Sequence, residues 1–243
     1  MIECRNVSFS YKKKNRQIYD ISLKLEEGYF TCLIGHNGAG KTTLMKLLYG
    51  SLLPDSGTVE KDGSVLSIDS LCEHRSGLFF VTKEAVWHPD RPLMSYSKTL
   101  AKLYPKYSEE EFLENLRKLD FISGKDAGTK NLDKTFSELS YGERMKVITA
   151  FGLATHPEYM ILDEPFANLD PLVKSELARM IHTRVAKDGM GVLISTHLLD
   201  EVSDMADYVA VMEKGRLVKY GDREEIMSNT DLRTVLRESR ETE

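Results

Sequence analysis

The sequence predicts an α/β protein with a mostly parallel sheet core, an N-terminal antiparallel β part and an inserted α-helical subdomain. Apolar and polar residues alternate over 2–11 and again over 21–25, as in paired strands with one solvated face. Short apolar runs recur at 29–34, 78–81, 159–162 and 191–196, as in buried parallel strands. Helical spacing dominates between the second and the third of these runs, so a helical block interrupts the core.

The elements at the two ends of the chain follow from the same patterns. Strands are expected at 2–11 and 21–25, where apolar residues alternate with polar ones. After the first buried strand, apolar residues at helical spacing predict a helix that Gly50 can end. Strands at 208–212 and 217–220 flank a turn near the C-terminus.

The helical block is expected to contain two long helices. Residues 95–122 are predicted as helix, with Ser108 and Glu111 placed as a capping box. A polar loop rich in glycine and lysine is expected at 123–136, and a second helix at 141–155. The block thus separates the first half of the sheet from the second.

The composition excludes several kinds of protein. The net charge of −5 argues against a general nucleic-acid binder, which needs a basic face. Cys4, Cys32 and Cys72 have neither metal-ligand spacing nor a disulfide framework, so reduced thiols in the cytoplasm are expected. No apolar run approaches the ~18 residues that span a bilayer, and no signal peptide is expected.

Residues 35–42 match the phosphate-loop pattern, because four residues separate a glycine from Gly-Lys-Thr. An apolar strand precedes the motif and a helix follows it, which argues against a chance glycine-rich turn. Glycines let backbone N–H groups converge on phosphate, and the helix start adds positive charge. Lys41 would contact the β- and γ-phosphates of ATP, and Thr42 would contact Mg²⁺. The candidate nucleotide-binding residues are Asn37, Gly38, Ala39, Gly40, Lys41, Thr42 and Thr43.

Two acidic residues follow the apolar run at 159–162. A strand there would deliver Asp163 to the sheet edge, where its carboxylate can hold Mg²⁺. Glu164 comes next, and a carboxylate in that position can orient and activate the attacking water. The alternative is a capped strand end with two solvated acids. The phosphate loop favours the metal and catalytic roles.

Residues 139–143 read LSYGE and allow two interpretations. Ser140 and Glu143 fit a capping box for the following helix. The same helix start offers N–H groups, a hydroxyl and a positive dipole end to a phosphate. Together with the preceding motifs, the segment resembles the signature motif of ABC ATPases, usually written LSGGQ. Ser140 and Gly142 are retained, while Tyr141 and Glu143 replace a glycine and the glutamine.

The resemblance extends over nearly the whole chain and implies a P-loop, RecA-like core. Tyr11 stands where the family has an aromatic that stacks on adenine, although a core strand position is the alternative. Residues 168–170 resemble the D-loop, and Asp170 is expected to cap a helix that begins at Pro171. His197 ends a strand and resembles the switch histidine, which contacts the γ-phosphate in a catalytic role.

The resemblance also implies a single ABC ATPase domain over 1–243. Residues 1–83 and 158–229 would form the core with the nucleotide site, 84–157 a helical subdomain with the signature motif, and 230–243 a short charged tail. A second nucleotide-binding subunit, identical or paralogous, would complete each site. One chain would supply Lys41, Thr42, Asp163, Glu164 and His197, and the other Ser140 and Gly142.

One position departs from the family pattern. Where the family has a glutamine between the core and the helical subdomain, the sequence has Lys83, followed by Glu84. A protonated lysine cannot ligate a metal. Either Glu84 substitutes or the contact is lost, and a shift of one residue in the alignment is a third possibility.

The resemblance implies an ATPase subunit that drives transport through a separate transmembrane permease, from the cytoplasmic side of the cell membrane. Residues 87–92 stand where such subunits receive a permease, or form a packed loop anchored by Trp87. The compact domain favours an exporter over sugar importers with added domains.

A soluble ABC ATPase acting on ribosomes or DNA is the alternative class. Neither tandem domains nor long coiled-coil insertions support it. A GTPase or a nucleoside kinase would leave the signature-like segment at 139–143 unexplained. No nucleic-acid partner is expected.

Overall fold

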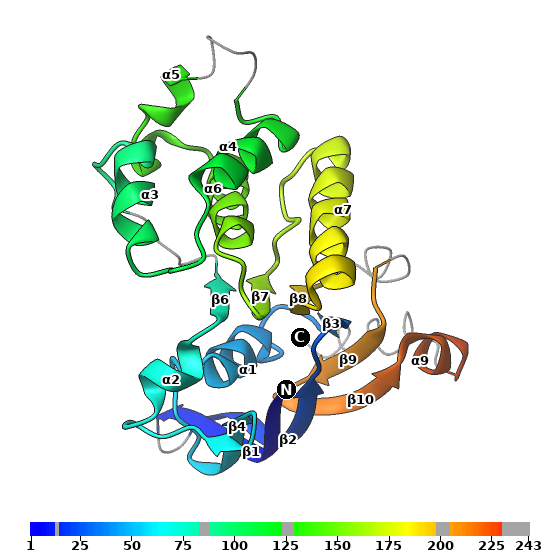
Figure 1. Cartoon of the computed structure of the whole chain (residues 1–243). Coiled ribbons are helices and arrows are strands. Elements are labelled where there is room, and N and C mark those ends of the chain that lie inside the picture. The colour runs from blue at the N-terminus through cyan, green and yellow to red at the C-terminus, as the bar shows by residue number, and fades with distance from the viewer. Residues whose placement is uncertain (13–14, 83–87, 123–128, 198–204, 230–243) are drawn as a thin grey trace. The chain divides into compact units, whose positions relative to one another are not determined.

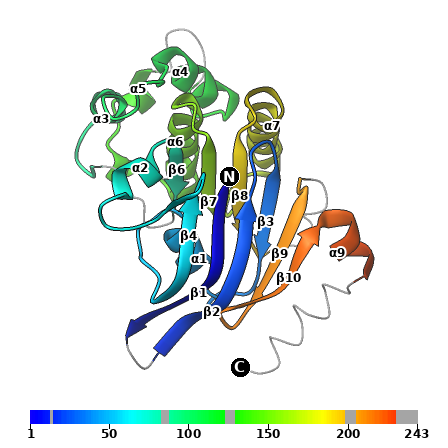
Figure 2. The same ribbon diagram turned by 60° about the horizontal axis from the view of Figure 1, so that its bottom comes forward.

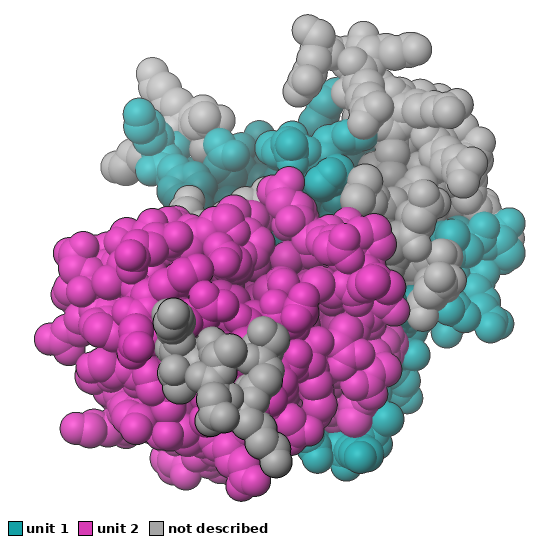
Figure 3. Space-filling view, turned by 90° about the horizontal axis from the view of Figure 1, so that it is seen from above, with its two compact units in different colours: residues 1–80, 158–164, 185–243 teal, residues 81–157, 165–184 magenta. Residues whose placement is uncertain are grey.

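The computed structural model describes residues 1–12, 15–82, 88–122, 129–197 and 205–229. The chain divides into two compact units, which Figure 3 distinguishes by colour. Unit 1 contains residues 1–80, 158–164 and 185–243, and unit 2 contains residues 81–157 and 165–184. Two internal segments therefore form unit 2, while unit 1 includes both ends of the chain.

The first sheet of unit 1 is antiparallel, as the alternating N-terminal sequence predicts. Its strands are β1 (Ile2–Lys12), β2 (Asn15–Leu25), β4 (Ser56–Lys61) and β5 (Ser64–Val65). They are ordered β2-β1-β4-β5, and Figure 2 shows the two long strands side by side. The sheet supplies one wall of the core.

The second sheet confirms the mostly parallel core. Its strands are β3 (Phe30–Ile34), β6 (Leu78–Val81), β7 (Tyr159–Asp163), β8 (Gly191–Thr196), β9 (Tyr208–Glu213) and β10 (Arg216–Asp222). Their order is β10-β9-β3-β8-β7-β6; β3 pairs in parallel with β8 and β9, and β7 with β8, while β10 is antiparallel to β9. Every residue of β3, β7 and β8 is buried, which explains their continuous apolar runs.

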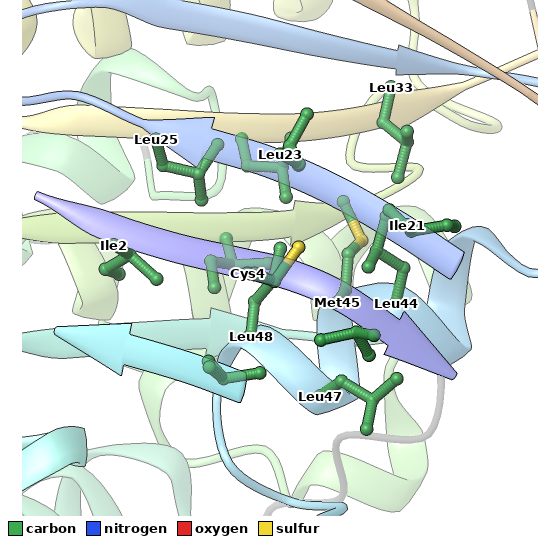
Figure 4. Packing of buried hydrophobic residues seen from close by; sticks show 14 of the residues in the cluster. Ile2, Cys4, Ile21, Leu23, Leu25, Leu33, Leu44, Met45, Leu47 and Leu48 are labelled. Carbon is green, nitrogen blue, oxygen red and sulfur yellow. The ribbon is translucent and has the colours of Figure 1, made fainter. Parts of the chain in front are cut away.

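Helix α1 (Lys41–Leu48) joins the two sheets into one hydrophobic core. Leu44 and Leu48 belong to the same buried cluster as Ile21 of β2 and Cys4 of β1 (Figure 4). Gly50 has φ +79° and donates its N–H to the carbonyl of Leu47, so it ends the helix as predicted. Burial of several large aliphatic side chains at about 1.5–3 kcal/mol each fixes α1, and with it the loop that precedes it.

Two shorter helices also lie in the described part of unit 1. They are α2 (Leu71–Arg75), which follows the antiparallel sheet in the chain, and α9 (Arg223–Asn229), which follows β10. The three cysteines are free thiols; Cys4 and Cys32 are buried and Cys72 is exposed. Burial raises the pKa of the Cys4 thiol to about 12.

Unit 2 is helical (Figure 1). Its elements are α3 (Leu93–Ala101), α4 (Glu109–Lys118), α5 (Thr129–Leu132), the 3₁₀ turn η1 (Phe136–Glu138), α6 (Tyr141–Ala154) and most of α7 (Pro171–Asp188). Phe112 of α4 meets Phe151 of α6 with ring centroids 5.7 Å apart, and Tyr107 lies 4.9 Å from Phe151. No helix among the described residues is long and apolar enough to cross a bilayer.

The prediction of one helix over 95–122 is wrong, because the segment contains two helices. α3 ends at Ala101, and Pro105 disfavours helical backbone at the residue before it. Ser108 then caps α4 by accepting the N–H of Glu111 at 3.2 Å. The predicted capping residues therefore mark the start of a new helix and do not lie inside a longer one.

The predicted loop at 123–136 also needs correction over its described part. Residues 129–132 form α5, and η1 begins at Phe136. Thr135 and Glu138 form a capping box, with the Thr135 N–H donating to the Glu138 carboxylate at 2.6 Å. Short helical turns of this kind depend on local side-chain hydrogen bonds and leave no apolar periodicity in the sequence.

Candidate functional site

Glycines set the shape of the phosphate loop (residues 35–43). Gly38 and Gly40 have φ +83° and +104°, a region that residues with a Cβ atom rarely adopt. A Cβ atom at Gly35 would lie 2.5 Å from the carbonyl oxygen of Met212. α1 begins directly after Gly40, so its unpaired N-terminal N–H groups and positive dipole end lie at the loop.

Lys41 is held inside the loop. Only 5% of its surface is exposed, and its ammonium donates to the carbonyl oxygens of Gly35 and His36 at 2.5 and 3.1 Å. The N–H of Ala39 donates to the same His36 carbonyl at 3.2 Å, while Asn37 is exposed. The loop thus presents backbone and one positive charge from a defined position.

Asp163 is brought beside Thr42, which lies 121 residues earlier in the chain. The Thr42 hydroxyl donates to Asp163 Oδ2 at 2.7 Å. Mg²⁺ in phosphate sites takes one or two protein oxygens and fills its octahedron with water and substrate phosphate. A hydroxyl and a carboxylate in contact at the end of the phosphate loop fit that donor set. The described residues contain no cluster of three His, Cys, Asp or Glu that would indicate an all-protein metal cage.

Glu164 and His197 approach each other at the carboxyl ends of β7 and β8. Glu164 Oε1 lies 3.7 Å from His197 Nδ1. The Glu164 side chain is 9% exposed and that of His197 is 42% exposed. Glu164 has φ +49°, a left-handed conformation that a residue with a side chain adopts only when its surroundings hold it. The pair combines a constrained carboxylate with an accessible imidazole.

The Ser195 hydroxyl connects Asp163 and Glu164. Sequence reasoning did not identify Ser195 as a site residue. Its hydroxyl donates to Asp163 Oδ1 at 2.5 Å and accepts the Glu164 N–H at 3.0 Å. The only sequence signal is a hydroxyl near the end of a continuously apolar strand. Its meaning depends on the parallel register of β7 and β8, which pairs Asp163 with Ser195.

Tyr11 lies on β1 with 53% of its surface exposed. Its ring packs edge-on against Phe9 at 4.9 Å, and its hydroxyl lies 3.4 Å from the Thr43 hydroxyl. Tyr11 is therefore not a buried core residue. It presents a largely open ring, and its hydroxyl contacts a residue of the phosphate loop.

The signature-like segment lies in unit 2. Ser140 precedes α6 and accepts the Glu143 N–H at 3.3 Å, while its own N–H donates to Glu143 Oε2 at 2.8 Å. The Ser140 N–H lowers the pKa of the Glu143 carboxyl. A Cβ atom at Gly142 would lie 3.2 Å from the carbonyl oxygen of Asn168. The capping interpretation is thus confirmed, and the exposed Ser140 hydroxyl remains at the helix start.

The site residues predicted from the sequence fall into two groups. Those of the phosphate loop and Tyr11, Asp163, Glu164 and His197 belong to unit 1, whereas Ser140 and Gly142 belong to unit 2. Asp170 accepts the Leu172 N–H at 2.9 Å and α7 begins at Pro171, as predicted. Lys83, Glu84 and Trp87 lie outside the described residues.

Comparisons with known proteins agree with this geometry. A family model described as ABC transporter matches residues 18–167. The energy-coupling factor transporter ATP-binding protein EcfA2 of Streptococcus sanguinis is 32% identical over 240 residues. That match covers 95% of this chain and 84% of the relative.

Solved structures of ABC transporter components are similar to the chain as well. One described as the ATP-binding subunit of an ABC transporter has a TM-score of 0.84 and 25% identity, over 98% of this chain and 99% of its own. The cbiO1 protein of Clostridium perfringens, described as part of the ABC transporter complex cbiONQ, has a TM-score of 0.73 and 25% identity. That match covers 96% of this chain and 93% of cbiO1.

Proposed function

Because the chain belongs to the ABC transporter family, as an ATP-binding and ATP-hydrolysing subunit, we propose that it powers transport through a separate membrane permease by ATP-driven closure of a dimer. The observation that carries the proposal is the continuous chain of contacts from Thr42 through Asp163 and Ser195 to Glu164 and His197. It joins the phosphate loop to the residues suited to activate water.

In the proposed mechanism, Lys41 and the loop N–H groups bind the β- and γ-phosphates of ATP. Thr42 and Asp163 would hold Mg²⁺, which when bound neutralises phosphate charge. Glu164 orients the attacking water and accepts its proton, since its carboxylate is constrained by the backbone. His197 would contact the γ-phosphate, and its partly exposed side chain 3.7 Å from Glu164 supports that role.

The second half of each site would come from another subunit. Ser140 and Gly142 stand at the start of α6, whose N–H groups and positive dipole end suit a phosphate. Head-to-tail pairing of two chains would place this helix start at the ATP held by the partner subunit. Both the dimer and its closure follow from the family resemblance of residues 139–143, with the exposed Ser140 hydroxyl as support.

The transporter type follows from the relatives. Their names describe ATP-binding proteins of energy-coupling factor transporters, so we propose that type for this chain, acting at the inner face of the cell membrane. The export direction expected from the sequence receives no support from these relatives and stays a prediction. ATPase activity that rises when a co-purified permease is reconstituted would test the transport role. Activity unaffected by any membrane component would favour the soluble class.

Glu164→Gln tests the catalytic assignment. We expect turnover to fall by at least about 100-fold, because general-base catalysis contributes roughly 10²–10⁴ and the amide cannot accept the proton. ATP should still bind and should shift the protein to a dimer, since hydrolysis no longer reopens it. Phosphate release and size-exclusion chromatography with ATP measure the two effects.

Lys41→Ala provides the contrasting variant. It should lose ATP binding as well as turnover, because a buried ammonium in the phosphate loop is removed. Near-normal turnover in Glu164→Gln would remove Glu164 from the catalytic role. Normal ATP binding and turnover in Lys41→Ala would contradict the assignment of the whole loop.

A further inference from the structure

We infer that Ser195 is a positioning residue of the ATPase site, which holds the Asp163 carboxylate and the Glu164 backbone in one arrangement. The inference rests on the proposed roles of these two acids in ATP hydrolysis. It assigns to the strand before the switch histidine a role in placing both of them.

The burial of Ser195 is the first observation. The residue is 0% exposed, within a strand whose other residues are all buried. A hydroxyl in such a place is costly unless its hydrogen bonds are made. Here both are made, and both reach the catalytic segment. The proton is donated to Asp163 Oδ1 at 2.5 Å, and the oxygen accepts the Glu164 N–H at 3.0 Å.

The geometry of Asp163 is the second observation. The residue is 3% exposed, and each carboxylate oxygen has a different hydroxyl donor, Ser195 on Oδ1 and Thr42 on Oδ2 at 2.7 Å. Two donors from opposite sides fix the rotation of the carboxylate. Without the Ser195 hydroxyl, Thr42 would be the one hydroxyl donor left to this carboxylate among the described residues, and Oδ1 would be buried without that donor.

The backbone of Glu164 is the third observation. Its φ of +49° turns the chain sharply after β7, and its N–H is held by both the hydroxyl and the carbonyl oxygen of Ser195, at 3.0 and 3.2 Å. This turn directs Glu164 toward His197, whereas Asp163 contacts Thr42. Ser195 on β8 thereby holds both Asp163, the proposed Mg²⁺ ligand, and Glu164, the residue proposed to activate water.

Ser195→Ala tests the inference. We expect kcat to fall about 10–100-fold, the range typical of removing a hydrogen-bond partner behind a metal-site carboxylate. The KM for ATP should change by less than about threefold, because the phosphate loop is untouched. A purely structural loss would lower the amount of folded protein, and with it the apparent kcat at an unchanged KM. The folded fraction is therefore measured by thermal unfolding, and kcat is expressed per folded molecule.

A second readout does not require turnover. In the Glu164→Gln variant, the affinity for a fluorescent ATP analogue is measured at increasing Mg²⁺ concentrations. Ser195→Ala should raise the half-saturating Mg²⁺ concentration about tenfold, as expected for a loosened ligand. The affinity measured in EDTA should not change.

Ser8→Ala is the matched control. The buried Ser8 hydroxyl on β1 accepts the Asp20 N–H at 3.0 Å, and Asp20 has φ +53°. Ser8 thus accepts the N–H of a residue with positive φ, as Ser195 does from Glu164. Among the described residues, the Ser8 hydroxyl has no recorded contact with a carboxylate. Ser8→Ala should leave kcat and the Mg²⁺ titration unchanged. An equal loss in both variants would overturn the inference.

Ser195→Cys covers the case in which the alanine variant does not fold. Its thiol is similar in size but a weak donor, so kcat should fall several-fold and the Mg²⁺ requirement should rise. Wild-type values in either folded variant would overturn the positioning role. If Lys41→Ala and Glu164→Gln abolish hydrolysis while Ser195→Ala keeps the wild-type kcat and Mg²⁺ requirement, only this inference fails. If those two retain hydrolysis, the proposed function of the site fails.

Discussion

At the residue scale, Tyr11 holds a partly exposed aromatic ring beside the phosphate loop. Its ring is 53% exposed, yet Phe9 packs against one edge and the Thr43 hydroxyl lies 3.4 Å from its own. These two contacts limit the orientations of the ring without covering it. A half-open aromatic beside a phosphate loop is suited to stack on a nucleotide base.

Tyr11→Ala should therefore weaken ATP binding by about 5- to 100-fold, because stacking of a base on an aromatic contributes about 1–3 kcal/mol. Tyr11→Phe keeps the ring and should bind within about twofold of wild type. Equilibrium titration with a fluorescent ATP analogue measures both. Equal losses in the two variants would show that the hydroxyl contact to Thr43, and not the ring, carries the effect.

At this scale the sequence was most informative where function resides in consecutive residues. The loop that contains Lys41 and Thr42 is one uninterrupted segment, so its pattern could be read directly. Ser195 was not identified because its partners are 32 and 31 residues away, and strand register alone brings them together. A single hydroxyl in an apolar run does not reveal which strand lies beside it.

Helix starts are the features that matter most at the scale of elements. α6 begins with a reciprocal capping box between Ser140 and Glu143, and α4 begins with Ser108 accepting the N–H of Glu111. The two serines make the same backbone contact. Only the first belongs to a segment that resembles the signature motif.

Ser140→Ala should lower the free energy of unfolding by about 1 kcal/mol, the usual effect of removing a serine cap. The pKa of Glu143 is lowered in the folded state, so its contribution is present above the unfolded pKa of about 4.3 and is lost as the pH falls through the folded pKa. The charge-dependent part of wild-type stability, and hence part of the difference from the variant, should shrink at acid pH. Urea unfolding at pH 7 and at acid pH measures this.

Ser108→Ala separates capping from nucleotide contact. It should lose about the same stability, with ATP turnover unchanged. Ser140→Ala should lose both, because the proposal places its hydroxyl at the ATP of a partner subunit. If both variants keep wild-type turnover, Ser140 has only a capping role.

The segment 95–122 shows why element boundaries were harder to predict than element types. Apolar spacing continued through the break, so one long helix was expected. Pro105 and the capping serine at 108 end one helix and start another. Both signals are present in the sequence, where Ser108 and Glu111 were predicted as a capping box without a separate helix start. The sheet strands were predicted more accurately, because burial on both faces makes each one a distinct apolar run.

At the scale of the whole molecule, two other elements of unit 1 meet the phosphate loop. Gly215, in the turn between β9 and β10, donates its N–H to the Ala39 carbonyl at 2.9 Å and accepts the Tyr19 N–H at 2.8 Å. The antiparallel sheet, the β9–β10 turn and the loop thus meet at one glycine. Its φ is +78°, and a Cβ atom there would overlap the carbonyl oxygen of Gln17.

Gly215→Ala should lower both stability and ATP affinity. The left-handed backbone costs a residue with a Cβ atom about 1–2 kcal/mol, and overlap with a fixed carbonyl adds roughly 1–3 kcal/mol. Thermal unfolding and ATP titration measure the two losses. The displaced turn should disturb the loop through Ala39.

Gly63→Ala is the comparison variant. Gly63 has φ +82°, and an added Cβ atom would meet nothing within 4 Å. It should therefore show only the backbone cost, with wild-type ATP affinity. If Gly215→Ala binds ATP as tightly as Gly63→Ala does, the turn between β9 and β10 does not support the loop.

The contacts of Lys41 make ligand binding an exchange of hydrogen-bond partners. Its ammonium already has two acceptors, the carbonyl oxygens of Gly35 and His36. Any ligand must therefore exchange with partners that the protein itself provides, and it gains only the difference between old and new hydrogen bonds. A phosphate oxygen adds Coulombic attraction to the ammonium that a neutral oxygen lacks, so polyphosphates displace the carbonyls more readily than neutral oxygen compounds do. Discrimination against the many uncharged metabolites of a cell is thus built into the resting contacts of one side chain.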